Sequence, residues 1–167
     1  MSPSPSVNSS ADVIFVLDES VGVGRSNFAT LNLFLSKFVG KLDINSGKTR
    51  VGLLTFSVSA FTTVNLNAHS EVDTLRSAIS SLKYTGSSAT DTAAALDYVR
   101  TNMLKSEKGD RANVQNIVVL ITHEKSDDFG ATVVSIAFCT IHITVSAVRW
   151  SGCHDPILYQ NHCGLSC

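Results

Sequence analysis

Three short polar segments contain the residues of this chain whose types suit chemistry. Asp18 and Ser20 come directly after an apolar run, Thr90 lies in a loop of small hydroxylated residues, and His123 follows a second apolar run. Carboxylate and hydroxyl oxygens are hard ligands that suit Mg²⁺ or Mn²⁺, whereas an imidazole nitrogen suits Zn²⁺ better. The three segments therefore contain the donor atoms of a divalent-cation site, provided that the fold brings them together.

The two apolar runs predict that the fold does so. Residues 13–17 (VIFVL) and 117–121 (IVVLI) are continuous apolar runs, which are typical of strands buried on both faces of a parallel sheet. Each run ends abruptly in polar residues, which places Asp18 and His123 just beyond the carboxyl ends of their strands. Ligands bind at this edge in open α/β sheets.

Helical and strand patterns alternate along the rest of the chain. Ser26 or Asn27 is expected to cap the first helix. Together the elements predict an α/β fold with a doubly wound, mostly parallel central sheet, one antiparallel edge strand and helices on both faces. Apolar spacing predicts helices over residues 28–42, 72–82 and 96–103, and strands over residues 51–56, 59–66 and 141–148.

Composition excludes some classes of partner. The chain has 167 residues, 44% of them hydrophobic, with 13 basic and 14 acidic residues and a net charge of −1. This balance gives no electrostatic reason to expect nucleic acid or an anionic membrane as partner.

No apolar run reaches the roughly 18–20 residues that cross a bilayer. Residues 1–10 are rich in Ser and Pro without the apolar core of a signal peptide, and are expected to form a flexible lead-in.

The last residues of the chain contain all of its cysteines. Their clustering in residues 139–167 favours disulfides formed in an oxidising compartment. Free thiols are one alternative, and a metal site that uses His154 and His162 is another, although the spacing fits no standard zinc pattern. Asp155 followed by Pro predicts a brief closing helix over residues 155–160. The disulfide candidates are Cys139, Cys153, Cys163 and Cys167.

Four stretches of the sequence resemble the von Willebrand factor type A domain found in matrilins, collagen VI and other extracellular matrix proteins. They are DVIFVLDESVGVGRSNF, TRVGLLTFSVSAFTTVNLN, LKYTGSSATDTAAALDYV and NIVVLITHEKSDD. The resemblance implies a Rossmann-like sheet ringed by helices, which binds matrix proteins without catalysis. It also implies a metal-ion-dependent adhesion site, made by an Asp-x-Ser-x-Ser loop, a threonine and a later aspartate. The bound ion keeps an open position for a carboxylate of the partner.

The resemblance transfers that metal site only in part. Asp18, Ser20 and Thr90 match the motif, but Gly22 replaces its second serine and His123 replaces its later aspartate. One hydroxyl ligand and one negative charge are lost, so we expect weak or absent binding of Mg²⁺ or Mn²⁺, and binding of Zn²⁺ if His123 is a ligand. A histidine that is hydrogen-bonded to Asp18 in a metal-free polar cluster is the alternative.

Other polar residues of the same loops are candidates for direct contact with a partner: Glu19, Asp91 and Glu124. A hydrolase is not expected, because Ser20 lies in no G-x-S-x-G elbow and no oxyanion donor can be named. The sequence thus predicts a non-enzymatic domain.

Three functions remain open at this point. The first is a secreted adhesion module that binds a matrix protein such as collagen through the edge of the sheet that bears the polar loops, with weakened or lost Mg²⁺ dependence. The second is an assembly domain with a vestigial metal site, which links matrix or self-associates through other faces and its cysteines. The third is an intracellular scaffold with reduced cysteines. The glycosylation sequence Asn8-Ser9-Ser10 favours secretion.

The expected organisation is a lead-in over residues 1–10, a type A domain over 11–150 and a cysteine-rich tail over 151–167.

Overall fold

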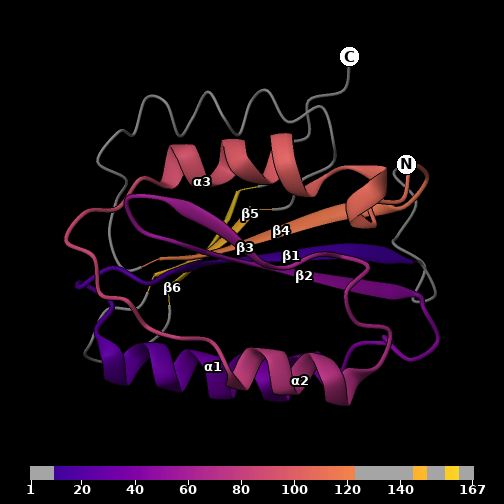
Figure 1. Cartoon of the computed structure of the whole chain (residues 1–167), viewed down its shortest axis with the longest axis horizontal. Coiled ribbons are helices and arrows are strands. Elements are labelled where there is room, and N and C mark those ends of the chain that lie inside the picture. The colour runs from indigo at the N-terminus through magenta and orange to yellow at the C-terminus, as the bar shows by residue number, and fades with distance from the viewer. Residues whose placement is uncertain (1–9, 123–144, 150–156, 162–167) are drawn as a thin grey trace.

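The structure is a computed structural model, which describes residues 10–122, 145–149 and 157–161. It has three layers (Figure 1): a central sheet lies between helices α1 and α2 on one side and helix α3 on the other. The order of strands in the sheet is β3-β2-β1-β4-β5-β6. The helices are α1 (Arg25–Val39), α2 (Val72–Ser80) and α3 (Thr92–Tyr98), and a π-helical segment, Val99–Met103, continues α3.

Strand β1 lies inside the sheet and is parallel to both of its neighbours, β2 and β4. Strand β3 pairs antiparallel with β2 at one edge and lies within the strand predicted over residues 59–66. The predicted fold class is confirmed, and β6 adds a second antiparallel strand at the opposite edge. The strands are β1 (Ala11–Asp18), β2 (Thr49–Phe56), β3 (Ala60–Val64), β4 (Gln115–Thr122), β5 (Val145–Arg149) and β6 (Ile157–Asn161).

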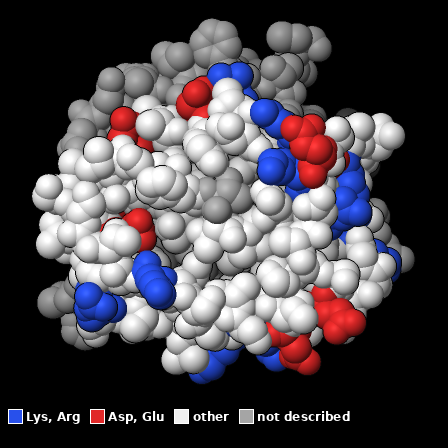
Figure 2. Space-filling view, in the orientation of Figure 1, with Lys and Arg blue, Asp and Glu red and all other residues white. Residues whose placement is uncertain are grey.

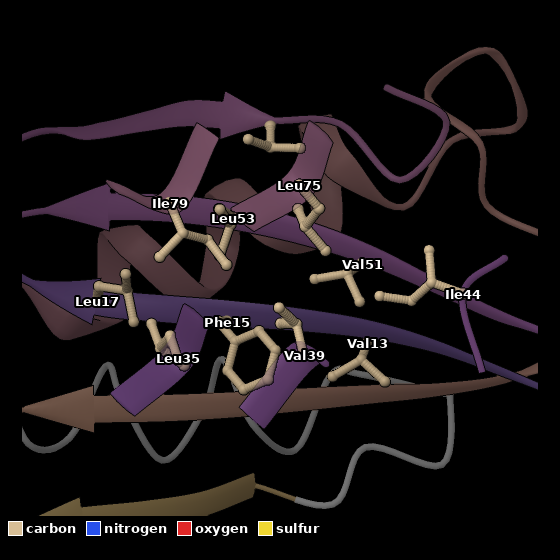
Figure 3. Close-up of a cluster of buried hydrophobic side chains, with 11 residues drawn as sticks. Val13, Phe15, Leu17, Leu35, Val39, Ile44, Val51, Leu53, Leu75 and Ile79 are labelled. Atoms are coloured by element: carbon tan, nitrogen blue, oxygen red, sulfur yellow. The ribbon is translucent and has the colours of Figure 1, made fainter. Parts of the chain in front are cut away.

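The apolar run of β1 fills two cores, because successive side chains of a strand point to opposite faces. Phe15 and Leu17 pack with Leu35 of α1 on one face (Figure 3), and Ile14 and Val16 pack under α3 on the other. All five side chains are at most 2% exposed. Burial on both faces explains why this strand has no apolar and polar alternation in its sequence.

Helix α1 begins earlier than predicted and without a side-chain cap. Its N-cap is Gly24, which has a φ of 76° and makes no side-chain capping hydrogen bond. The expectation that Ser26 or Asn27 caps this helix is wrong, since both lie inside it, and the Asn27 side chain donates to the carbonyl of Val23. The left-handed conformation at Gly24 lets the chain enter the helix at an angle that a side chain would strain.

The predicted closing helix is also wrong in its described part. Residues 157–160 belong to β6, which pairs antiparallel with β5 from Ile157 opposite Arg149 to Asn161 opposite Val145. The sequence Ile-Leu-Tyr at the start of β6 favours a strand, and pairing with β5 decides the outcome. Strand β5 confirms the described part of the strand predicted over residues 141–148.

Arg111 connects several segments of the chain at the end of the sheet where β1 begins. The backbone N–H of Arg111 donates to Oδ2 of Asp12 over 3.0 Å, while its guanidinium donates to Oδ1 from Nε and Nη2 over 2.9 and 2.7 Å. The same guanidinium donates to the carbonyls of Ala11, Gly47 and Lys48. Asp12 is fully buried. The charges of residues 105–113 alone would indicate a solvated surface connection, but Arg111 in this segment forms an ion pair with the buried Asp12.

Candidate functional site

Asp18 is the centre of the candidate site, at the carboxyl end of β1. It is only 1% exposed. Its Oδ1 accepts a hydrogen bond from the backbone N–H of Ser20, and its Oδ2 accepts one from the hydroxyl of Thr122, each over 2.8 Å. Thr122 ends β4, the strand beside β1. A buried carboxylate is thereby fixed in orientation by the loop that follows it and by the neighbouring strand.

The loop after β1 is held by a second loop from far along the chain. The backbone N–H of Val21 donates to the carbonyl of Ser87 over 2.7 Å, and that of Gly86 donates to the carbonyl of Glu19 over 3.2 Å. The hydroxyl of Tyr84 donates to the carbonyl of Ser20 over 3.0 Å. Ser20 is 4% exposed, so its side chain is positioned inside the site and away from bulk water.

Thr90 reaches the same end of the sheet just before α3. The backbone N–H of Asp91 donates to the carbonyl of Ser57 over 2.8 Å, and that of Glu19 donates to the adjacent carbonyl of Phe56 over 2.9 Å. The end of β2 therefore joins the loops that carry Asp18 and Thr90. Thr90 is 7% exposed, and the hydroxylated loop lies where the sequence places it.

Helix α3 starts with a cap and an orphaned hydroxyl. Asp91 is the N-cap, and its Oδ1 accepts from the backbone N–H of Ala94 over 2.8 Å. Thr92 is 2% exposed, and its hydroxyl oxygen is buried without a hydrogen-bond partner among the described residues. An unsatisfied buried hydroxyl costs free energy, so a water molecule bound to this atom would be stabilising.

Glu19 is a second acidic residue at the site, and it is 4% exposed. Burial raises the pKa of its carboxyl, a hydrogen bond with Thr85 lowers that pKa in part, and the negative charge of Asp18 raises it again. Glu19 also lines a groove beside β3.

These described donors suit a small hard cation. Asp18 supplies a carboxylate, and Ser20 and Thr90 supply hydroxyl oxygens, the ligand types that Mg²⁺ and Mn²⁺ prefer. The remaining predicted ligand, His123, lies outside the described residues, as do Glu124 and the four cysteines. Within the described ranges, no three His, Cys, Asp or Glu side chains gather into a metal-binding group.

Sequence reasoning placed Asp18, Ser20 and Thr90 correctly at one end of the sheet but missed two residues that organise them. Thr122 looked like the end of an apolar strand, and only the register between β1 and β4 shows that it meets Asp18. Tyr84 looked like the start of a loop. It contacts Phe28, with ring centroids 5.6 Å apart, and Arg25, whose guanidinium carbon lies 5.4 Å from the ring centroid.

The fold and the site define an open α/β domain with polar loops at the carboxyl ends of its parallel strands. Comparison with known families makes the class specific: residues 12–155 match the model of the von Willebrand factor type A domain. The chain belongs to this family, whose domains in matrix proteins are non-enzymatic.

Relatives and solved structures agree with this assignment. The chain is 35% identical to the collagen alpha-4(VI) chain of Mus musculus over 129 residues, which cover 76% of this chain and 6% of that one. It is 32% identical to von Willebrand factor of Rattus norvegicus over 122 residues, which cover 70% of this chain and 27% of that one. The chain thus spans only a small part of the relatives it matches.

Among solved structures, the fold resembles that of proximal thread matrix protein 1 from the mussel byssus. The TM-score is 0.78 at 21% identity, covering 85% of this chain and 38% of that one. A further structure of the mussel protein, with a TM-score of 0.75 and 21% identity over 85% of this chain and 38% of that one, has a zinc-occupied metal-ion-dependent adhesion site motif. No described helix of the present chain has the length and hydropathy that crossing a bilayer requires.

Proposed function

We propose that this domain is a secreted, matrix-type adhesion module that binds a matrix protein such as collagen through the loops at the carboxyl ends of β1, β2 and β4. The observation that carries the proposal is the buried Asp18, fixed by Ser20 and Thr122 and accompanied by the hydroxyl of Thr90. Relatives in collagens VI, XII and XX support a matrix role. Glu19, Asp91 and Glu124 are the proposed contacts with the partner.

The site contains some of the ligands that a divalent cation requires, but fewer than the family's full set. Asp18, Ser20 and Thr90 would hold the ion, and a bound ion would offer an open position to a carboxylate of the partner. Gly22 and His123 stand where the family has two further oxygen ligands. We therefore propose that Mg²⁺ dependence is weak or lost, and that Zn²⁺ binds better than Mg²⁺ if His123 is a ligand.

The test measures binding of the whole chain to immobilised collagen I and collagen VI by surface plasmon resonance, in Mg²⁺, in Zn²⁺ and in EDTA. Ser20→Ala removes a hydroxyl but keeps the backbone N–H that Asp18 accepts from. Thr30→Ala, which removes an exposed hydroxyl of α1 that donates to Ser26, is the matched control. We expect Ser20→Ala to weaken binding and Thr30→Ala to leave it unchanged.

The second candidate is an assembly domain that links matrix through other faces and through disulfides among Cys139, Cys153, Cys163 and Cys167. Clustering of the cysteines in the last residues of the chain favours it. Binding that survives both EDTA and Ser20→Ala would support this second function over the first. Mass mapping of the oxidised chain then identifies whether the cysteines pair within one chain or between chains.

A further inference from the structure

Strand β3 leaves one side of the sheet open. It is the terminal strand in the order of the sheet, and within the described residues it has β2 as its one neighbour. In Figure 1 the sheet is seen along its edge, with β5 and β6 faded at the back and β3 towards the viewer. An edge strand presents backbone N–H and C=O groups that can pair with another strand.

The register of the hairpin shows which backbone groups face outward. The N–H of Ser57 donates to the carbonyl of Ser59 over 3.1 Å, and Phe61 lies opposite Thr55. Hydrogen-bonded and non-hydrogen-bonded pairs alternate in an antiparallel ladder. By this alternation Phe61 bonds towards β2, while the peptide groups of Ala60 and Thr62 point away from β2, towards the open side.

This edge lacks two of the devices that keep edge strands apart, charge and proline, although β3 is short and its pairing with β2 shifts in register between Leu53 and Leu54. Residues 57–66 (SVSAFTTVNL) contain no charged residue and no proline, which are common protections of an exposed edge. Phe61 is 62% exposed and Val58, at the tip of the hairpin, is 57% exposed. Figure 2 shows the same face as mostly uncharged, with Lys, Arg, Asp and Glu gathered mainly near its rim.

We propose that β3 pairs with β3 of a second copy of this chain, antiparallel about a two-fold axis at Phe61. In this register Ala60 forms a hydrogen-bonded pair with Thr62 of the second copy, and Thr62 with its Ala60. The two Phe61 residues form the non-hydrogen-bonded pair at the axis, with Cα atoms about 4.5 Å apart. The edge is therefore complementary to itself, as a two-fold interface requires.

A groove beside β3 has room for the aromatic ring of the second copy. Its volume is about 580 Å³, and its walls include Phe61, Thr63 and Leu82 together with one residue of each charge, Glu19 and Lys83. Thr55, which lies opposite Phe61, also lines the groove, so the ring of Phe61 and the groove are on the same face of the sheet. Pairing about the axis brings the second Phe61 to this face, where its exposed area is covered.

The absence of charged residues on β3 favours a second copy of this chain as the strand that pairs with it. Two identical strands with a charge would repel each other at the axis, but no charged residue lies on β3 or in the residues that flank it. The contact is one short strand, well below the roughly 1,200–2,000 Å² of a stable interface. We therefore expect a reversible dimer that strengthens when domains are held close together in a longer protein. The groove shares Glu19 with the candidate site, but the pairing of β3 uses backbone groups and does not rest on the proposed function.

The first experiment is sedimentation velocity on the whole chain from roughly 10 µM to 1 mM, the range of weak association. We expect a concentration-dependent dimer that is insensitive to EDTA. Phe61→Lys places two like charges at the axis and should give a monomer with an unchanged melting temperature, since the side chain is exposed. Leu33→Lys adds the same charge at a residue of α1 that is 58% exposed and should dimerise as the wild type does.

The second experiment tests the register. Phe61→Cys places two thiols at the axis within the Cα separation of a disulfide, about 4.4–6.8 Å, and mass mapping should find residue 61 linked to residue 61. Thr63→Cys is the control, because its partner across the axis is residue 59. A wild type that is monomeric at all concentrations, or a dimer that persists in Phe61→Lys, overturns the proposal. The first of these results leaves the edge to an extended segment of another protein.

Discussion

The hydroxyl of Thr122 lies 2.8 Å from Oδ2 of Asp18, so the last residue of β4 holds the last residue of β1. These residues are 104 positions apart in the chain, and the parallel register of the two strands makes them neighbours. The candidate site is thus a property of strand pairing as well as of the loop that carries Asp18.

Thr122→Val removes this hydrogen bond while keeping the shape of the side chain. A hydrogen bond to a buried charged group contributes about 1.5–3 kcal/mol, so we expect a loss of that size in the free energy of unfolding, measured by urea denaturation. Thr101→Val is the control, because its hydroxyl donates to a carbonyl one turn earlier in its own helix. A loss in both variants of equal size would contradict a special role for Thr122.

Arg111→Ala should be strongly destabilising. It leaves the carboxylate of Asp12 fully buried without its counter-charge, and breaking a buried pair in this way costs about 3–5 kcal/mol. Arg100→Ala, which breaks an exposed pair with Asp97, should cost under about 1 kcal/mol. Chemical denaturation of the two variants measures the difference, and similar losses would show that the buried pair has no greater effect than the surface pair.

Glu19→Gln should stabilise the domain at neutral pH. Burial raises the pKa of Glu19 in the folded state, so the charged carboxyl opposes folding at pH values above that raised pKa. The opposition fades as pH falls through the raised pKa and is absent below the ordinary value of about 4.5. We expect the variant to have the higher melting temperature at pH 7 and the same one as the wild type near pH 4. A gap that widens on acidification would contradict this assignment.

Gly86→Ala should loosen the loop that holds Ser20. Gly86 has a φ of +73°, and an added Cβ would lie 2.9 Å from the ring of Tyr84. Gly47→Ala is the control, since its φ is +77° but nothing lies within 4 Å of an added Cβ. Both variants carry a left-handed strain of about 1–2 kcal/mol. We expect Gly86→Ala to lose more stability than Gly47→Ala in thermal denaturation, because only it disturbs Tyr84.

Restoring the two altered ligand positions should restore Mg²⁺ binding. Gly22 is not one of the described glycines with positive φ, so its backbone accepts a serine. We expect Gly22→Ser combined with His123→Asp to raise the affinity for Mg²⁺ at least about tenfold, or 1.4 kcal/mol, in calorimetric titration. Gly22→Ala with the same histidine replacement controls for the hydroxyl. Equal affinities in these two double variants would exclude residue 22 as a ligand position.

Much of the fold could be predicted because it is encoded locally. The runs at residues 13–17 and 117–121 have the composition of strands buried on both faces, and the structure places them in β1 and β4. Residues 157–160 were predicted wrongly, because Asp155 and Pro156 are a local helix signal whereas β6 is stabilised by pairing with β5. Pairing between distant segments has no local signature.

The residues of the candidate site also differ in whether the local sequence predicts them. The position of Asp18, Ser20 and Thr90 at one end of the sheet can be predicted because each follows or precedes a recognisable element. Thr122 and Tyr84 were missed because their partners are set by strand register and by a hydrogen bond between loops 64 residues apart. The role of Arg111 was hidden among the charges of a polar connection for the same reason.

The distance in sequence between Asp12 and Arg111 also determines when this domain can fold during its synthesis. The two residues are 99 positions apart, and β4, which covers one side of β1, follows Arg111. At a synthesis rate of about 5–20 residues per second, roughly 5–20 s pass between the synthesis of β1 and the synthesis of β4. Throughout this interval one edge of the most apolar part of the nascent chain is unpaired. Strand β4 therefore joins β1 only late in synthesis, and β5 and β6 extend the sheet after it.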